Sequence, residues 1–312
     1  MRRQVPARTS THRTSHPGTR MTTTFAAAAA DPAFRGRIGS DARSGHYPVP
    51  HRYRLHLSPS CPHCLGIAIT HGLLDLGDTL PVTHLPAVPD APDCGYAALR
   101  PLYEASAHQY RGPAAAPVLS DDWTGRIVST HAPDILHDLA ARFAGPGPDL
   151  YPASARDAID ALVHRCEQDI NQAAQQAGRL GSDHPGYASA LDTLLGALAA
   201  LEQQLADRPY LLGPELTVAD VQLWVTLVQL DTVHRWHLDA AAVQRIAGHR
   251  HLWSYARSLA ARPAFARSLD LDAIARRHHA RCRGREAAGA AVQIVDWTTA
   301  PAPDQHVTPA PR

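Results

Sequence analysis

The alternation of apolar and polar residues predicts that order begins with a strand near Tyr53. In RYRLHLS, residues 52–58, apolar and polar side chains alternate with a period of two, which is typical of a half-buried strand. From Leu65 onward the apolar positions take helical spacing, and Gly77 can end the predicted helix. The stretch TLPVTHL, residues 79–85, predicts a second strand.

The next elements complete a small α/β unit. Residues 86–113 read as a loop with a short helical patch in YAALRPLYEAS. APVLSDD and GRIVST predict two strands of a hairpin joined by DDWTG, and APDILHDLAARF predicts a helix. The order strand, helix, strand, loop, hairpin, helix predicts a thioredoxin-like α/β domain over residues 46–145.

Residues 150–285 predict a second domain that is all helical. AGPGPDLYP, residues 144–152, reads as the linker, and a leucine stripe over 191–205 marks one helix clearly. Thr217 and Asp220 have the spacing of a capping box at the start of another helix. Residues 1–45 and 286–312 lack periodicity, so we expect a disordered lead and a flexible tail.

Composition narrows the class of protein. The chain has 312 residues, a net charge of +1 and 45% hydrophobic residues, which fits a globular protein and gives no electrostatic case for nucleic acid. No apolar run approaches the roughly 20 residues that cross a bilayer. Five cysteines are too few for a disulfide scaffold of this length. We therefore expect a soluble, cytoplasmic protein without a membrane or nucleic-acid partner.

The stretch SPSCPHCLGI, residues 58–67, carries the chemistry. Proline is favoured at the first position of a helix, so Pro62 predicts that Cys61 is the N-cap and that Cys64 lies in the first turn. Unpaired N–H groups and the helix dipole there favour thiolate and lower the pKa of a thiol below about 8.5. Cys61 is the predicted nucleophile and Cys64 the predicted resolving thiol.

Cys61 and Cys64 have two alternative interpretations, a buried structural role and a zinc site. Free cysteine is often a small buried hydrophobe. Zinc would need further ligands, and the chain has no second CxxC; His234 and His237 in HRWH, and the pair in HRH, are candidates by residue type only. We therefore expect no metal.

Ala116 and Pro117 are the second candidate feature. In a thioredoxin-like domain a cis proline opens the third strand, and the residue before it offers its backbone to an extended, peptide-like ligand. The alternative is that Pro117 merely begins an edge strand.

The run from about Tyr53 to His279 resembles a glutathione transferase and, more narrowly, the Xi class, the glutathionyl-hydroquinone reductases. The resemblance is carried, in chain order, by GHYPVPHRYRLHLSPSCPHC, LRPLYEASAHQYRGPAAAPVLSDDWTGRIVS, DLYPASARDAIDALVHRCEQDIN, YLLGPELTVADVQLWVTLVQLD and DLDAIARRHH. It implies that Cys61 takes glutathione off a conjugate of an aromatic, quinone-type acceptor by forming a mixed disulfide that a second thiol releases. Ala116 and Pro117 match the position that holds the glutathione backbone, and a homodimer is implied.

The chain departs from that family around the thiol ligand. The family's Cys-Pro-Trp motif reads Cys-Pro-His here, and the Glu-Ser pair expected for the γ-glutamyl group is replaced by His131 and Ala132. Two family tyrosines align with Gln175 and His234.

Three readings stay open. The first is a Xi-like thiol reductase that uses glutathione or another low-molecular-weight thiol such as mycothiol. The second is a dithiol-disulfide oxidoreductase cycling Cys61 and Cys64, and the third is a non-catalytic binding protein with this fold.

Overall fold

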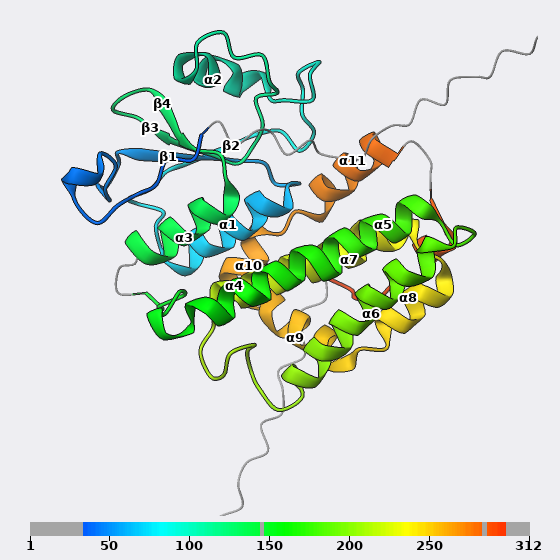
Figure 1. The fold of residues 1–312 in the computed structure, drawn as a ribbon. Helices are drawn as coiled ribbons and strands as arrows, with labels where there is room; N and C mark the ends of the chain where they lie inside the picture. The colour runs from blue at the N-terminus through cyan, green and yellow to red at the C-terminus, as the bar shows by residue number, and fades with distance from the viewer. Residues whose placement is uncertain (1–33, 144–146, 283–285, 298–312) are drawn as a thin grey trace, which may run out of the picture. The chain divides into compact units, whose positions relative to one another are not determined.

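The computed structural model describes residues 34–143, 147–282 and 286–297. These residues contain a four-stranded sheet with three associated α-helices, followed by a larger set of helices (Figure 1).

The sheet has the order β2-β1-β3-β4. Its strands are β1 (Tyr53–Leu57), β2 (Val82–His84), β3 (Val118–Asp121) and β4 (Arg126–Ser129). β2 is parallel to β1, whereas β1 with β3 and β3 with β4 are antiparallel. The predicted hairpin is confirmed, with β3 and β4 joined through residues 122–125.

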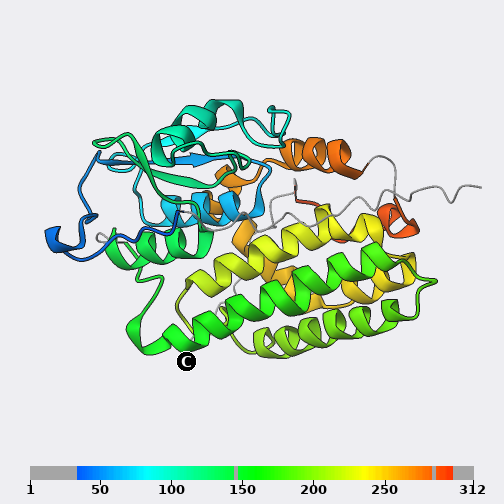
Figure 2. The same ribbon diagram turned by 45° about the horizontal axis from the view of Figure 1, so that its top comes forward.

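Helices cover both faces of this sheet. α1 (Pro62–Leu73) and α3 (Ala132–Arg142) pack together on one face, and α2 (Arg100–Ser106) lies over the other (Figures 1 and 2). The apolar alternation along β1 accounts for the face covered by α1 and α3, because Tyr53, Leu55 and Leu57 are all buried in the cluster that these helices share. This is the thioredoxin-like arrangement predicted from the sequence, which is confirmed.

The second half is helical, as predicted. Its α-helices are α4 (Arg156–Arg165), α5 (Ala173–Leu180), α6 (Gly186–Leu205), α7 (Val218–Thr232), α8 (Ala240–Ala247), α9 (Arg250–Ala260), α10 (Pro263–Ser268) and α11 (Leu271–Cys282). A π-helical segment, η4 (Cys166–Gln172), connects α4 to α5. The 3-10 turns are η1 (Ala42–Ser44), η2 (Ala97–Leu99), η3 (Ala153–Ala155), η5 (His234–His237) and η6 (Ala288–Ala291).

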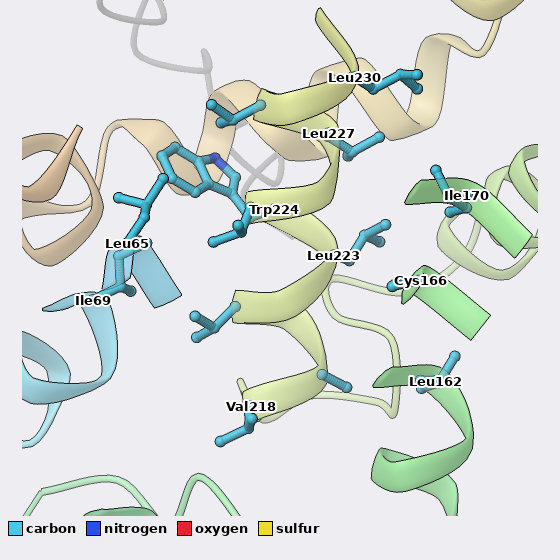
Figure 3. Packing of buried hydrophobic residues seen from close by; sticks show 14 of the residues in the cluster. Leu65, Ile69, Leu162, Cys166, Ile170, Val218, Leu223, Trp224, Leu227 and Leu230 are labelled. Atoms are coloured by element: carbon cyan, nitrogen blue, oxygen red, sulfur yellow. The ribbon is translucent and has the colours of Figure 1, made fainter. Parts of the chain in front are cut away.

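Helix α7 forms the centre of the core and joins the two halves. Trp224 is fully buried, and Figure 3 shows it on the side of α7 that faces Leu65 and Ile69 of α1. Leu223 and Leu227 point instead toward η4, where Cys166 lies (Figure 3). Residues of both halves therefore form one continuous apolar cluster, and α1 is held from both sides.

The start of α7 is fixed by the predicted capping box. The Asp220 carboxylate accepts the Thr217 N–H at 2.8 Å and the Thr217 hydroxyl at 2.9 Å. It also accepts the N–H of Leu211 and the hydroxyl of Tyr255, each at 2.8 Å, which the sequence did not reveal. Asp220 is fully buried, so these donors replace the water it loses on folding.

The expected lead of residues 1–45 needs a correction. Residues 34–39 lie against the α/β half, whereas residues 40–45 are exposed: Ile38 is only 2% exposed, and its N–H donates to Asp138 of α3 at 2.7 Å. Arg37 pairs with the same carboxylate at 2.6 Å, and Arg35 with Asp134 at 2.8 Å. Arg35 and Arg37, in a segment expected to be disordered, thus form ion pairs with carboxylates about 100 residues later in the chain. The remainder of the lead, residues 1–33, lies outside the described residues.

The expected flexible tail needs a similar correction. Residues 286–297 contain η6, Val295 is 4% exposed, and the Trp297 indole N–H donates to Asp231 of α7 at 2.7 Å. Residues 298–312 and 144–146 lie outside the described residues. Across the part of the chain that is described, none of the helices has the length and apolar character needed to cross a bilayer.

Candidate active site

Cys61 lies in the loop between β1 and α1, directly before the first residue of α1. Cys61 is the N-cap residue, in extended conformation, and Pro62 occupies the first turn. The Cys61 carbonyl accepts the first hydrogen bond of the helix from Leu65 N–H at 2.9 Å. Cys61 is 6% exposed and Cys64 1%, so the predicted local geometry is confirmed and the outer sulfur is the more accessible one. All five cysteines lie within the described ranges and are free.

The pKa values of the two thiols are shifted in opposite directions. A hydrogen bond from the Cys64 thiol holds the pKa of Cys61 well below its ordinary value, although burial acts in the other direction; His63 and Arg277 lower that pKa further. Burial, reinforced by the hydrogen bond and charge of Cys61, raises the pKa of Cys64 well above its ordinary value. Cys61 is therefore the more acidic of the two thiols, and the Cys64 thiol is its hydrogen-bond donor.

A cationic helix from the far end of the chain faces this thiolate. Arg277 of α11 donates to the Ser60 hydroxyl at 3.3 Å and to the Tyr96 hydroxyl at 3.2 Å. Burial lowers the pKa of the Arg281 guanidinium one turn later, whereas the Cys61 thiolate raises it. Ser60 also donates to the Ala87 carbonyl, so the loop before Cys61 is fastened from two sides.

Ala116 and Pro117 lie at the same end of the sheet as Cys61. The peptide bond between them is cis. Val118 pairs with His56 in antiparallel register, so the two residues before Val118 stand beside the chain that leaves β1 toward Cys61. The fold thus brings Cys61, Ala116 and Pro117 to the same end of the sheet, although the role of Ala116 and Pro117 in binding a ligand stays a prediction.

His131 and Ala132, at the positions expected for a γ-glutamyl anchor, form a different arrangement. His131 is the N-cap of α3, and its Nδ1 lies 3.0 Å from a carboxylate oxygen of Asp134. Arg35 lies 3.1 Å from the same nitrogen and bonds to Asp134. The carboxylate at this end of α3 is therefore Asp134, and it is already shared with an arginine of the N-terminal segment.

A cavity of about 110 Å³ opens between the start of α1 and the helical half; Pro62 and His63, the two residues after Cys61, line it, whereas Cys61 itself does not. Its lining residues are Pro62, His63, Glu167, Asn171, Gln175, Gln222, Val225, Gln229 and His234. Gln175 and His234, the two positions aligned with family tyrosines, both line it. Burial lowers the pKa of His234 to about 4, so this imidazole is neutral near pH 7.

The cavity has an unusually polar wall. Four of its side chains are amides, and two amide atoms, Asn171 Oδ1 and Gln229 Nε2, are buried without a hydrogen-bond partner among the described residues. Buried polar atoms are normally satisfied, so these two indicate a polar ligand or water. A larger hollow of about 420 Å³ involves α6 and α8, far from the two thiols, and has no reactive cysteine in its wall.

Several of these residues could not be picked out from the sequence. Arg277 was part of a quoted segment but was given no role, and Glu167, Asn171, Gln222 and Gln229 were not singled out. The available signal for Glu167 and Asn171 was their spacing of four residues, the same spacing that separates Asn171 from Gln175. Nothing local distinguishes Arg277 from the other arginines of α11.

Comparison with known proteins places this site in a family. The family described as glutathione S-transferase, C-terminal domain, matches residues 153–258. A curated relative named glutathionyl-hydroquinone reductase PcpF, from Sphingobium chlorophenolicum, is 30% identical over 253 residues, which cover 75% of this chain and 79% of the relative. The chain belongs to the glutathione transferase superfamily, and to its Xi class.

Solved structures agree with this assignment. The Xi glutathione transferase of Phanerochaete chrysosporium superposes with a TM-score of 0.67 at 28% identity, covering 79% of this chain and 90% of that one. The glutathione-bound structure of the glutathione transferase homologue YqjG from Escherichia coli superposes with a TM-score of 0.69 at 26% identity, covering 79% of this chain and 87% of that one. The predicted fold class is confirmed.

Proposed function

We propose that this protein is a cysteine-dependent thiol reductase that removes a low-molecular-weight thiol, glutathione in the first instance, from conjugates of an aromatic, quinone-type acceptor. The observation that carries the proposal is the Cys61 thiol, whose pKa is held well below its ordinary value at the start of α1. The relative named glutathionyl-hydroquinone reductase supports the substrate class.

The reaction has two balanced steps. The Cys61 thiolate attacks the sulfur of a glutathionyl-hydroquinone, a sulfur–sulfur bond forms, and the sulfur–carbon bond breaks. The aromatic carbon receives the bond electrons and takes up a proton, which leaves the free hydroquinone and a mixed disulfide on Cys61. A second glutathione thiolate then attacks that mixed disulfide, which releases glutathione disulfide and restores the Cys61 thiolate.

Three features would assist these steps. The cationic groups of Arg277 and Arg281 stabilise negative charge at the Cys61 sulfur between turnovers. The cis Ala116–Pro117 segment would hold the extended backbone of the thiol ligand in the manner of an added strand. The amide side chains of the cavity would hydrogen-bond the two oxygens of a hydroquinone ring.

The residues expected to bind the thiol ligand are those in which this chain differs most from its family. The glutathione-bound relative favours glutathione. The ammonium of a γ-glutamyl group would meet Asp134 and His131, with Arg35 already bonded to the carboxylate. Another low-molecular-weight thiol, such as mycothiol, is therefore included in the proposal.

A dithiol cycle is the second candidate, and the hydrogen bond between Cys64 and Cys61 favours it. In that cycle the Cys64 sulfur attacks the mixed disulfide, releases the bound thiol and forms an intramolecular disulfide with Cys61. Two further thiols then reduce this disulfide. The high pKa of Cys64 slows its attack, which is why the monothiol route is preferred here.

The test follows hydroquinone and glutathione disulfide by liquid chromatography and mass spectrometry, with glutathionyl-p-hydroquinone and glutathione as substrates. We expect turnover by the wild-type protein and by Cys64→Ser, and none by Cys61→Ser. Cys94→Ser, at an exposed cysteine, is the matched control and should turn over like the wild type.

Each outcome separates the candidates. A mixed-disulfide adduct that accumulates on Cys61 in Cys64→Ser, with turnover lost, would establish the dithiol route. Absence of both adduct and turnover in the wild type, with glutathione and with mycothiol conjugates, would refute both catalytic candidates.

A further inference from the structure

We propose that His237, His278 and Cys282 form a binding site for a zinc ion, separate from the Cys61 and Cys64 pair. We expected no metal, because the chain has no second CxxC and His237 is a candidate ligand by residue type only. The fold supplies the partners.

The three side chains converge at the end of α11. Cys282 Sγ lies 3.4 Å from His237 Nε2, and 3.3 and 3.2 Å from the two ring nitrogens of His278. One ligand atom from each residue can be chosen so that all three lie within 4.8 Å of one another. Around tetrahedral zinc, with Zn–N near 2.0 Å and Zn–S near 2.3 Å, neighbouring ligand atoms are about 3.3–3.6 Å apart. The sulfur–nitrogen distances are close to this spacing. Because only one nitrogen of an imidazole points at a bound ion, the His278 ring would turn so that one of its two nitrogens faces the ion.

Secondary structure explains why these residues meet. His278 and Cys282 are four residues apart on α11, so they share one face of the helix. His237 is the last residue of η5, which lies against that face. Gly178 of α5 leaves room for it, because a Cβ at position 178 would lie 2.7 Å from the His237 Cβ. Three separate elements thus fix the position of the His237 ring.

The ligand set selects the class of ion. Two imidazole nitrogens and one thiolate suit zinc and related borderline or soft ions, whereas magnesium and calcium prefer oxygen. His278 is 5% and Cys282 4% exposed, so the site is shielded on two sides, while His237 is half-buried. Three protein ligands leave the fourth tetrahedral position for a water molecule or another donor.

Such an ion would fasten the last turn of α11 to η5. The same helix carries Arg277, which reaches Ser60 beside the nucleophile, and Arg281, which lies between Arg277 and Cys282 in sequence. Zinc at His237, His278 and Cys282 would therefore act at a distance from Cys61, by fixing the helix that presents the cations. The metal-binding inference itself does not rest on the proposed reductase activity.

The test uses the full-length protein without an affinity tag, purified through a chelator and then dialysed against zinc chloride. Zinc per chain is measured by atomic emission, and affinity by competition with a chromophoric chelator. We expect one zinc per chain in the wild type. Cys282→Ser should bind zinc at least about 10- to 100-fold more weakly. That loss is typical when a residue that only hydrogen-bonds to a metal ligand is removed, and Cys282 is itself a proposed ligand. Cys94→Ser and the double variant Cys61→Ser/Cys64→Ser should bind like the wild type.

A second measurement avoids any dependence on the variants' folding. Cobalt(II) added to the metal-free wild type should give the ultraviolet thiolate-to-cobalt charge-transfer band and tetrahedral d–d bands, and zinc should displace both. Three results would overturn the proposal: no zinc above a protein-free blank, wild-type affinity in Cys282→Ser, or loss of zinc only in Cys61→Ser/Cys64→Ser. None of these readouts involves turnover, so they are independent of the test of the reductase.

Discussion

Nη1 of Arg277 lies 3.3 Å from the hydroxyl oxygen of Ser60, the residue directly before Cys61, although 217 positions separate the two along the chain. The contact joins α11 to the loop that carries Cys61. It places a positive charge that lowers the pKa of Cys61, so we expect the reactivity of this thiol to depend on α11.

Replacing this arginine tests that dependence. Arg277→Gln removes the charge that helps to lower the pKa of Cys61, so alkylation of Cys61 near pH 6 should slow by about two- to fivefold, the scale of one partly exposed ion pair. The rate is measured by iodoacetamide labelling and peptide mass spectrometry. Arg276→Gln changes an exposed residue on the same helix and should leave the rate unchanged. Equal slowing in both variants would contradict a specific role for Arg277.

The hydrogen bond from Cys64 predicts a shift in the pH profile of Cys61. At pH values below the pKa of a thiol, the thiolate fraction and the alkylation rate fall about tenfold per pH unit. Wild-type Cys61 should therefore stay reactive well below the range in which an ordinary thiol has lost its reactivity.

Two variants at position 64 isolate the donor. Cys64→Ala removes the hydrogen bond, so the pKa of Cys61 should rise and the alkylation profile should move to higher pH. Cys64→Ser keeps a hydroxyl donor and should lie between Cys64→Ala and the wild type. If Cys64→Ala had the same profile as the wild type, the hydrogen bond would not be what lowers the pKa of Cys61.

At Gly289 the backbone lies so close to two carbonyl oxygens that a residue with a Cβ would clash with them. A Cβ there would lie 2.4 Å from the Leu238 carbonyl oxygen and 2.6 Å from that of Arg235, and both are backbone atoms that cannot turn away. Gly289→Ala should therefore lower the free energy of unfolding by about 1–3 kcal/mol, the usual cost of overpacking.

A second glycine provides the control. Gly196 lies in the interior of α6, and a Cβ added to it would meet open space. Gly196→Ala should raise the free energy of unfolding by about 0.5–1 kcal/mol, because alanine loses less backbone entropy in a helix. Urea denaturation of both variants checks the pair, and destabilisation of similar size at the two positions would contradict the steric argument.

The buried Asp220 carboxylate should be sensitive to a small chemical change. Asp220→Asn keeps the size of the side chain but replaces one acceptor oxygen by an N–H₂ group that faces donors. We expect the free energy of unfolding to fall by about 2–4 kcal/mol, from loss of charge-assisted hydrogen bonds and an unsatisfied buried group.

Tyr255→Phe removes a single donor to the same carboxylate. It should cost about 1–2 kcal/mol, clearly less than Asp220→Asn, in the same urea experiment. An equal or larger loss in Tyr255→Phe would contradict the view that Asp220 acts through several donors together, because this variant keeps the ring and removes only one of them.

The sequence predicted those parts of the molecule that depend on neighbours along the chain. The N-cap position of Cys61 follows from Pro62, the start of α7 from the spacing of Thr217 and Asp220, and the hairpin from its turn residues. In each case the interacting residues are at most a few positions apart, so the local residue types and their spacing are enough to predict the structure.

Features formed by distant residues escaped prediction. Arg37 looked like part of a disordered, basic lead because Asp138, its partner, lies 101 residues away. His237 and Cys282 are 45 residues apart, and only the packing of η5 on α11 brings them together. Hydrophobic periodicity identifies buried faces but does not say which polar groups will meet.

The π-helical segment η4 makes the cavity depend on chain length as well as on residue type. Glu167 and Asn171, four residues apart in η4, both line the cavity, and so does Gln175, four residues further along in α5. Deleting one residue from η4 would leave the hydrophobic content of the helix almost unchanged, yet would turn one half against the other by about 100°. In the proposed reductase, the fit of this cavity to its acceptor would therefore depend on the number of residues in η4 as well as on their types.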